Sequence, residues 1–129
     1  MGDLGKYDSH GMIWFYGRKS HRVITSHRTL YTIPCEAVFN RHPLVSRSAL
    51  VGIDTPVPGI KKPVICIQLK KGIRPNNKLT AGLRELGSSF TMTRSVSEFL
   101  FKKEFPVDPR HNAKIYREKL AVWASKKIQ

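Results

Sequence analysis

The stretch Lys62–Gly72, KPVICIQLKKG, decides the fold because it alternates between two faces that are both largely apolar. Val64, Cys66 and Gln68 point to one face. Ile65, Ile67 and Leu69 point to the other. A strand that is apolar on both faces is covered on both sides by other elements. We therefore expect this segment to be the central strand of a sheet.

Other segments predict the elements around this strand. Strands are indicated at 11–18, 21–26 and 44–53, helices at 34–42, 76–87 and 115–125, and either a strand or a short helix at 95–105. Asn76 is expected to cap its helix and Gly87 to end it. Tyr116, Leu120 and Trp123 form a stripe that should dock the last helix on the core. These elements predict an α+β fold, a small sheet of about three core strands packed with helices plus an N-terminal hairpin.

A polar segment, FPVDPRHNAK, precedes the last helix. Pro106 and Pro109 disfavour regular structure before Ala113, since proline lacks an N–H and restricts its neighbour. Lys114 follows at the point where the helical pattern begins. We expect a polar turn with Lys114 at its end.

Charge is the strongest signal in the composition. The 129 residues include 23 Lys and Arg against 9 Asp and Glu, a formal net charge of +14. Such a balance favours anionic partners. The basic residues are scattered in pairs rather than gathered in a tail, so much of the charge could equally be solvated surface. A basic nucleic-acid-binding domain remains a remote alternative, because aromatic and basic residues are not interleaved as in a stacking surface.

Length and composition fit one domain, or one domain with a tail from a neighbouring domain. No apolar run reaches the roughly 20 residues of a membrane span, and the polar start does not resemble a signal peptide. Cys35 and Cys66 lie in apolar surroundings without motif spacing, which predicts reduced core residues and a cytoplasmic protein.

Motifs of a complete active site are missing from the sequence. The five histidines show no metal-ligand spacing, and neither a nucleophile motif nor a glycine-rich phosphate loop is present. The polar start leads directly into an aromatic strand, so we expect the chain to begin inside a larger structure. The chain is therefore either a binding module or part of something larger.

Five short motifs, which follow one another along the chain, favour the second possibility, part of a larger protein. They are Gly2-Asp3, Gly17-Arg18, Pro34-Cys35-Glu36, Arg41-His42-Pro43-Leu44-Val45 and Ala113-Lys114. Together they resemble the C-terminal part of the adenylate-forming superfamily, which includes acyl-CoA synthetases, peptide-synthetase adenylation domains and luciferases. The resemblance covers essentially the whole chain. It implies that residues 1–19 end a large ATP-binding domain and that 20–129 form a mobile C-terminal domain.

The resemblance also implies roles for single residues. Lys114 matches the lysine that promotes acyl-adenylate formation, and Asp3 and Arg18 match residues that contact the ribose or phosphate of ATP. The hinge between the domains would lie at Lys19-Ser20, where Ser20 replaces the usual aspartate or lysine. ATP with Mg²⁺ would be the cofactor, the N-terminal domain and a fatty acid the partners, and no metal is expected on this chain. Alone, the chain should be inactive.

A narrower likeness is to the olefin-biosynthesis branch, whose activity is β-lactone synthesis from a long-chain β-hydroxy acid and ATP. Three segments show this likeness: GRKSHRV, LYTIPCE and FPVDPRHNAKIYREKLAVWA. The loop that lines the pantetheine tunnel in CoA ligases reads TSHRTLYTIP and lacks its usual glycine. This departure argues against CoA as the acceptor. A long-chain acyl-CoA ligase is the alternative.

Overall fold

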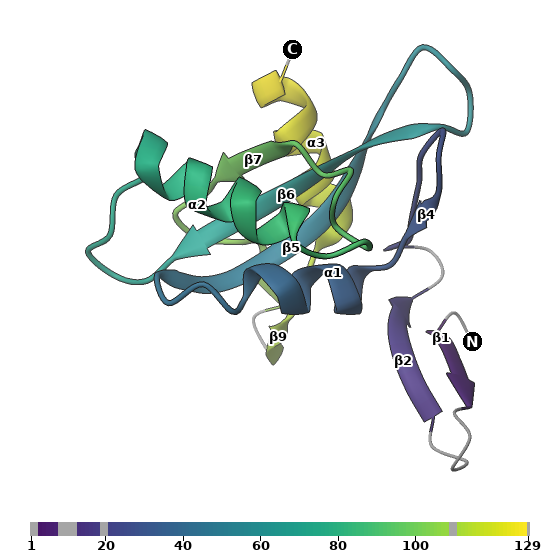
Figure 1. Ribbon diagram of the computed structural model, residues 1–129, viewed down its shortest axis with the longest axis horizontal. Helices are drawn as coiled ribbons and strands as arrows, with labels where there is room; N and C mark the ends of the chain where they lie inside the picture. The colour runs from purple at the N-terminus through teal and green to yellow at the C-terminus, as the bar shows by residue number, and fades with distance from the viewer. Residues whose placement is uncertain (1–2, 8–12, 19–20, 109–110, 129) are drawn as a thin grey trace.

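The computed structural model describes the backbone of residues 3–7, 13–18, 21–108 and 111–128, and the side chains of 21–107 and 115–128. The elements in chain order are β1 (Asp3–Tyr7), β2 (Ile13–Arg18), β3 (Val23–Ile24), β4 (Thr29–Leu30), α1 (Thr32–Phe39), β5 (Val45–Asp54), β6 (Lys61–Leu69), α2 (Asn77–Ser88), β7 (Glu98–Phe101), β8 (Val107–Asp108), β9 (His111–Ile115) and α3 (Arg117–Ile128) (Figure 1). The predicted α+β class is confirmed. No helix in these ranges is both long enough and apolar enough to cross a bilayer.

The core of the fold is a three-stranded mixed sheet in the order β5-β6-β7. β5 runs antiparallel to β6, with Ala49 opposite Cys66, and β7 runs parallel to β6, with Leu100 opposite Cys66. β6 includes Lys62–Leu69, the part of the segment that alternates between two apolar faces. Its central position is confirmed, and the undecided segment 95–105 forms a strand over Glu98–Phe101.

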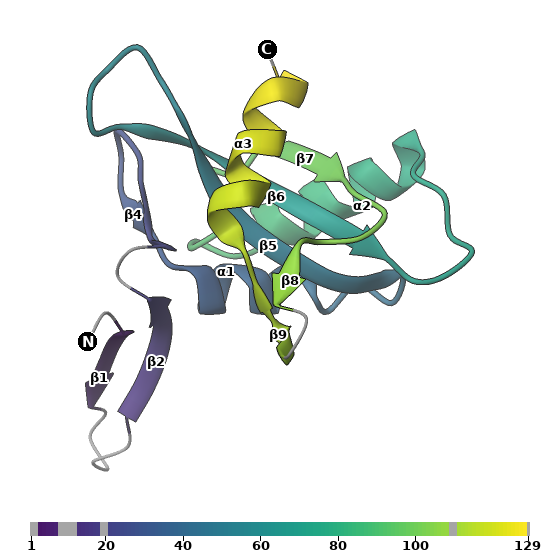
Figure 2. The same ribbon diagram turned by 180° about the vertical axis from the view of Figure 1, so that it is seen from behind.

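Alternation along β6 divides the core into two layers. On one face lie α1 and α2, with a buried cluster that includes Phe39, Leu83, Ile65 and Ile67 (Figure 1). On the other face lies α3, whose Leu120 and Ala124 are buried in a second cluster with Val64 and Cys66 (Figure 2). The predicted split of β6 side chains between two apolar faces is therefore confirmed, and so is docking of the last helix through Leu120.

Helix α1 begins at Thr32, two residues before the predicted start at Pro34. Pro34 occupies the first turn, where backbone N–H groups have no partner within the helix, so its missing donor costs nothing there. Five of the eight residues are buried, among them the acidic Glu36. α1 is thus a core helix with a single carboxylate inside it.

Helix α2 begins as predicted and ends differently. The Asn76 side chain accepts a hydrogen bond from the Leu79 N–H at 2.8 Å, which confirms the cap. The predicted stop at Gly87 is wrong, because the helix runs through Gly87 to Ser88 and Ser89 follows in a right-handed helical conformation. The position of Gly87 requires a residue without a side chain, because its backbone lies against the ring of Phe39.

The segment before the last helix also differs from the prediction. Instead of an irregular turn, β8 and β9 pair as an antiparallel hairpin, with Val107 opposite Ile115. Helix α3 begins at Arg117 rather than at residue 115. The proline-based prediction failed because a two-residue β8 needs few backbone donors, and Pro106 contributes its carbonyl to the Tyr116 N–H at 2.8 Å.

Candidate active site

The two residues predicted to contact the nucleotide lie opposite each other on the N-terminal hairpin. β1 and β2 pair antiparallel, and Asp3 is the cross-strand partner of Arg18. Directly opposed residues of such a pair have Cα atoms about 4.5–5.5 Å apart. The backbone thus brings together two positions that are fifteen residues apart in sequence. Their side chains, and the predicted hinge at Lys19 and Ser20, lie outside the described residues.

Lys114 belongs to strand β9, and its side chain also lies outside the described residues. The residues that follow it are well anchored. Ile115 packs against the second core cluster, and the Tyr116 N–H donates to the Pro106 carbonyl. The β8–β9 hairpin and the β1–β2 hairpin both extend below the central sheet in the two opposite views (Figures 1 and 2). The three predicted site residues therefore come from two hairpins at the same side of the domain.

A buried ion pair lies at the junction between β9 and α3. The guanidinium of Arg117 donates from Nη1 to Oε2 of Glu36 at 2.8 Å and from Nη2 to Oε1 at 3.1 Å. Oε2 also accepts a hydrogen bond from the Leu50 N–H at 2.8 Å. The side chains of Arg117 and Glu36 are 17% and 12% exposed. This pair joins the start of α3 to α1 and to β5.

Burial shifts the protonation equilibrium of Glu36. Loss of solvent raises the pKa of its carboxyl above the ordinary value, while the charge of Arg117 and the Leu50 hydrogen bond act in the opposite direction. The charge of Arg47 also lowers the pKa, by the smallest contribution. Burial outweighs these contributions, so the carboxylate depends on its partners to remain ionised.

The first residues of the segment TSHRTLYTIP, which the resemblance aligns with a glycine loop of CoA ligases, form the β3–β4 turn. The Thr25 N–H and hydroxyl both donate to the Arg28 carbonyl, at 2.9 and 2.8 Å, and the Thr25 hydroxyl accepts from the Arg28 N–H. Among the described residues, no residue other than glycine has a positive φ. Ser26 and His27 therefore close the turn without the left-handed conformation that glycine would permit.

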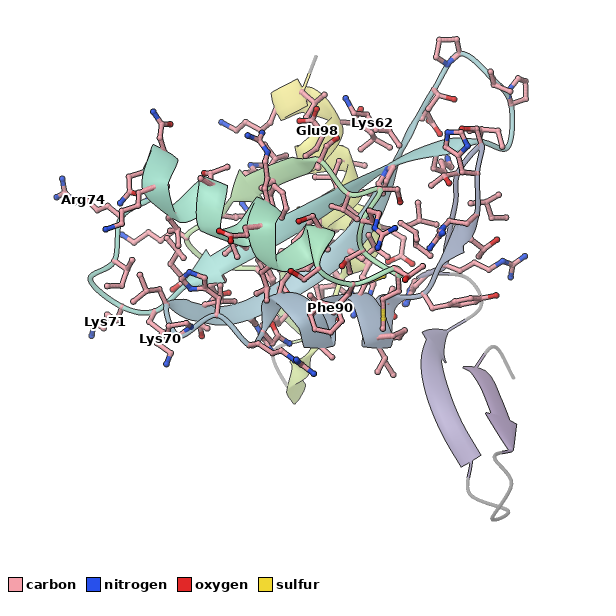
Figure 3. All side chains as sticks on the ribbon, in the orientation of Figure 1. Lys62, Lys70, Lys71, Arg74, Phe90 and Glu98 are labelled. Atoms are coloured by element: carbon pink, nitrogen blue, oxygen red, sulfur yellow. The ribbon has the colours of Figure 1, made fainter. Side chains whose placement is uncertain are left out.

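Much of the positive charge is spread over the surface. Lys70, Lys71 and Arg74, in the loop after β6, are exposed and point away from the body of the domain (Figure 3). Arg41 stacks over the ring of Phe90, with its guanidinium carbon 4.9 Å from the centroid. These side chains follow β6, α1 and α2, and none of them belongs to either hairpin.

The described part of the chain contains neither a cluster of metal ligands nor an exposed cysteine. No group of three or more His, Cys, Asp or Glu residues there could hold a metal ion. Burial raises the pKa of the Cys35 and Cys66 thiols to about 12. Both cysteines are free and buried, as predicted, and are inert core residues.

No role was predicted for Arg117, and none for Glu36 beyond its place in the Pro34-Cys35-Glu36 motif. A signal was available for Glu36, because it is the only acidic residue in the otherwise apolar segment CEAVF. A buried carboxylate requires a charged or hydrogen-bonding partner. Nothing local identifies that partner, since Arg117 is 81 residues away.

Comparisons with known proteins find similar sequences and similar folds. No protein-family model matches the chain. It is 47% identical over 127 residues to the olefin β-lactone synthetase of Xanthomonas campestris, covering 97% of the chain and 22% of that protein. It is 45% identical over 129 residues to the olefin β-lactone synthetase of Stenotrophomonas maltophilia, covering the whole chain and 23% of that protein.

Solved structures share the fold. An ATP-bound chimera of RpMatB and BxBclM superposes with a TM-score of 0.84 at 22% identity, covering 99% of this chain and 25% of the chimera. The anthranilate CoA ligase AuaEII, in complex with anthranoyl-AMP, superposes with a TM-score of 0.80 at 24% identity, covering 98% and 24%.

The chain belongs to the adenylate-forming ligases and has the fold of their C-terminal domain. Within that superfamily its sequence is similar to olefin β-lactone synthetases. It spans about a fifth of the length of those relatives.

Proposed function

We propose that the chain is the mobile C-terminal domain of an ATP-dependent ligase that activates a long-chain β-hydroxy fatty acid and closes it to a β-lactone. The observation that supports this proposal most strongly is the 47% identity to an olefin β-lactone synthetase over 97% of the chain. The remainder of the enzyme, with the carboxylate pocket and the phosphate-binding loop, would be the partner of this domain. A fatty acid would be the substrate and ATP the cosubstrate.

Lys114 would assist the first half-reaction. A carboxylate oxygen of the fatty acid attacks the α-phosphorus of ATP, the bond to the pyrophosphate oxygen breaks, and pyrophosphate leaves with the electron pair. Two anions must approach each other in this step. An ammonium placed between them opposes their repulsion and stabilises the crowded transition state. Lysine suits this role because it is a compact charge on a long stem.

Asp3 and Arg18 would hold the nucleotide from the N-terminal hairpin. A carboxylate can accept hydrogen bonds from two ribose hydroxyls through its two oxygens, and arginine can contact ribose or phosphate oxygens. The cross-strand register of the two residues supports a shared site. By the resemblance, Mg²⁺ would accompany ATP, and the residues that the structure describes hold no cluster of metal ligands.

The domain boundary would lie at Lys19 and Ser20, with residues 1–19 on the side of the larger domain and 20–129 in the mobile domain. Rotation about a few residues can move a domain as a rigid body. Such a rotation would withdraw Lys114 after adenylation and present another surface of the domain. The packing of residues 21–107 and 115–128 around one sheet supports movement as a unit.

The second half-reaction would need no external thiol. The β-hydroxyl oxygen of the substrate attacks the activated carbonyl carbon, the carbonyl carbon–oxygen bond to AMP breaks, and the hydroxyl proton passes to a base or to water. AMP leaves and a four-membered lactone remains. The β3–β4 turn, closed by Thr25 without a glycine, supports this reading over an acyl-CoA ligase. The sequence relatives also favour it over a nucleic-acid-binding domain.

Substitution of Lys114 tests the proposed role in the full-length enzyme. Lys114→Ala should abolish release of pyrophosphate from ATP and a β-hydroxy fatty acid, with an unchanged unfolding midpoint. Lys126→Ala is a matched control, because Lys126 is an exposed lysine in the last turn of α3. Near-normal pyrophosphate release by Lys114→Ala would refute the role.

A further inference from the structure

The Glu36–Arg117 ion pair is more elaborate than stability alone requires. Two hydrogen bonds join the guanidinium to the carboxylate, and the Leu50 N–H donates a third hydrogen bond to the carboxylate, at Oε2. Buried ion pairs often contribute no more to stability than apolar residues of similar volume, because both charges lose their solvation. What such a pair does provide is a fixed direction and separation, since a bidentate arrangement restricts both side chains.

The Glu36 side of the pair is rigid. Glu36 belongs to α1, a helix buried on most sides, and its backbone carbonyl accepts bonds from the Asn40 N–H and the Ser48 hydroxyl. β5 is an edge strand of the main sheet, and the backbone N–H of Leu50 is not used in pairing with β6. This N–H therefore needs an acceptor outside the sheet. The Glu36 carboxylate supplies that acceptor and is thereby fixed to the sheet.

The Arg117 side of the pair lies next to the proposed catalytic lysine. Arg117 is the first residue of α3 and follows Lys114 by three positions. Three residues span at most about 10 Å of chain. The two residues between them are also held, Ile115 by the second core cluster and Tyr116 by the Pro106 carbonyl. The Lys114 backbone therefore lies within a short, anchored segment that ends at Arg117.

We propose that Glu36 is a positioning residue for adenylation, which acts through Arg117 to fix the β9–α3 junction and with it Lys114. This inference rests on the proposed function, because it assigns a role to Glu36 only if Lys114 promotes adenylation. A charge that stabilises a transition state must be held within a fraction of an ångström of its place. Glu36 would supply that constraint from α1 without touching the substrate.

The test uses the full-length enzyme with ATP and a β-hydroxy fatty acid. The variants are Glu36→Gln, Arg117→Gln, the double variant, Arg117→Lys and Lys114→Ala. Two rates are measured for each: pyrophosphate release at saturating substrates, and AMP release from supplied acyl-adenylate. Glu36→Gln preserves volume and leaves an oxygen for the Leu50 N–H, and thermal unfolding identifies a temperature at which each variant is folded.

Glu98→Gln is the matched control. Glu98 forms an ion pair with Lys62, with 3.0 Å between Oε1 and Nζ. In Figure 3 both residues lie at the top of the domain, whereas β9 lies at its bottom in the same orientation. Removing this carboxylate breaks an ion pair of the same domain without disturbing the β9–α3 junction. Both half-reactions of this variant should stay within about twofold of the wild type, as expected for an exposed pair.

We expect Glu36→Gln and Arg117→Gln each to slow pyrophosphate release by about 10- to 100-fold, with a much smaller change in the KM for ATP. The double variant should be no slower than either single variant, because the two side chains act as one unit. Arg117→Lys should recover part of the rate. AMP release from supplied acyl-adenylate should be unchanged, since Lys114 is withdrawn in that step.

Three outcomes would overturn the inference. They are wild-type pyrophosphate release by Glu36→Gln, equal slowing of both half-reactions, and additive effects in the double variant. The Lys114→Ala variant distinguishes failure of this inference from failure of the proposed function. If Lys114→Ala abolishes adenylation while Glu36→Gln does not slow it, only the inference falls. If Lys114→Ala leaves adenylation intact, both fall.

Discussion

Gly87 of α2 lies so close to Phe39 of α1 that a Cβ atom at this glycine would be 2.9 Å from Cζ of the phenyl ring and 3.0 Å from Cε1. Phe39 is fully buried and meets the ring of Phe99 edge to face, with centroids 5.4 Å apart. Its ring therefore has little freedom to move. The two helices can approach over the sheet only because this position has no side chain.

Gly87→Ala should lower the free energy of unfolding. The added methyl group overpacks the contact with Phe39, which typically costs about 1–3 kcal/mol. Alanine also favours the helix over glycine by roughly 0.5–1 kcal/mol, so the net loss will be smaller than the steric cost. Urea unfolding of the chain measures the difference.

Gly82→Ala in the same helix is the control for Gly87→Ala. A Cβ atom there would meet only Nε2 of His42, at an ordinary 3.7 Å. We expect this variant to be stabilised by roughly 0.5–1 kcal/mol, from helix propensity alone. Equal effects of the two alanines would contradict the steric argument at Gly87.

Asn76→Ala should destabilise the start of α2. The Asn76 side chain satisfies the Leu79 N–H, which has no partner inside the helix. Loss of such a cap typically costs about 1 kcal/mol. Asn77→Ala, one residue later and exposed, should be neutral or slightly stabilising. The difference between the two unfolding midpoints in urea is the measurement, and no difference would exclude a capping role.

The two cysteines should resist thiol reagents in the folded protein. Burial raises the pKa of both thiols to about 12, so the reactive thiolate stays scarce as the pH rises from 7 to 9. We expect labelling by a disulfide reagent to be slow across this range and to become rapid and complete in denaturant. Fast labelling of one thiol without denaturant would show that its side of the core opens.

The full-length enzyme should release AMP from ATP and a β-hydroxy fatty acid in the absence of CoA. The expected cause is attack by the substrate's own hydroxyl, so the matched fatty acid without that group should release pyrophosphate but little AMP. Chromatography of the nucleotides measures both products. An absolute requirement for CoA would favour the acyl-CoA ligase alternative.

Features that depend on neighbouring residues were predictable from the sequence. The two-faced pattern of Lys62–Gly72 predicted a central strand, because alternation decides which side chains a strand directs to each face. The cap at Asn76 was predictable for the same reason, since the donor it satisfies is three residues away. The order of the five motifs predicted the superfamily, and the solved structures share its fold.

Features that depend on residues far apart in the chain needed the tertiary structure. The β8–β9 hairpin around Lys114 contradicts the local effect of the two prolines, because pairing and core packing outweigh propensity over such a short segment. Gly87 was predicted to be a helix stop, but its role is to admit Phe39. Glu36 and Arg117 meet across 81 residues, and no local pattern indicates which distant charge will compensate a buried carboxylate.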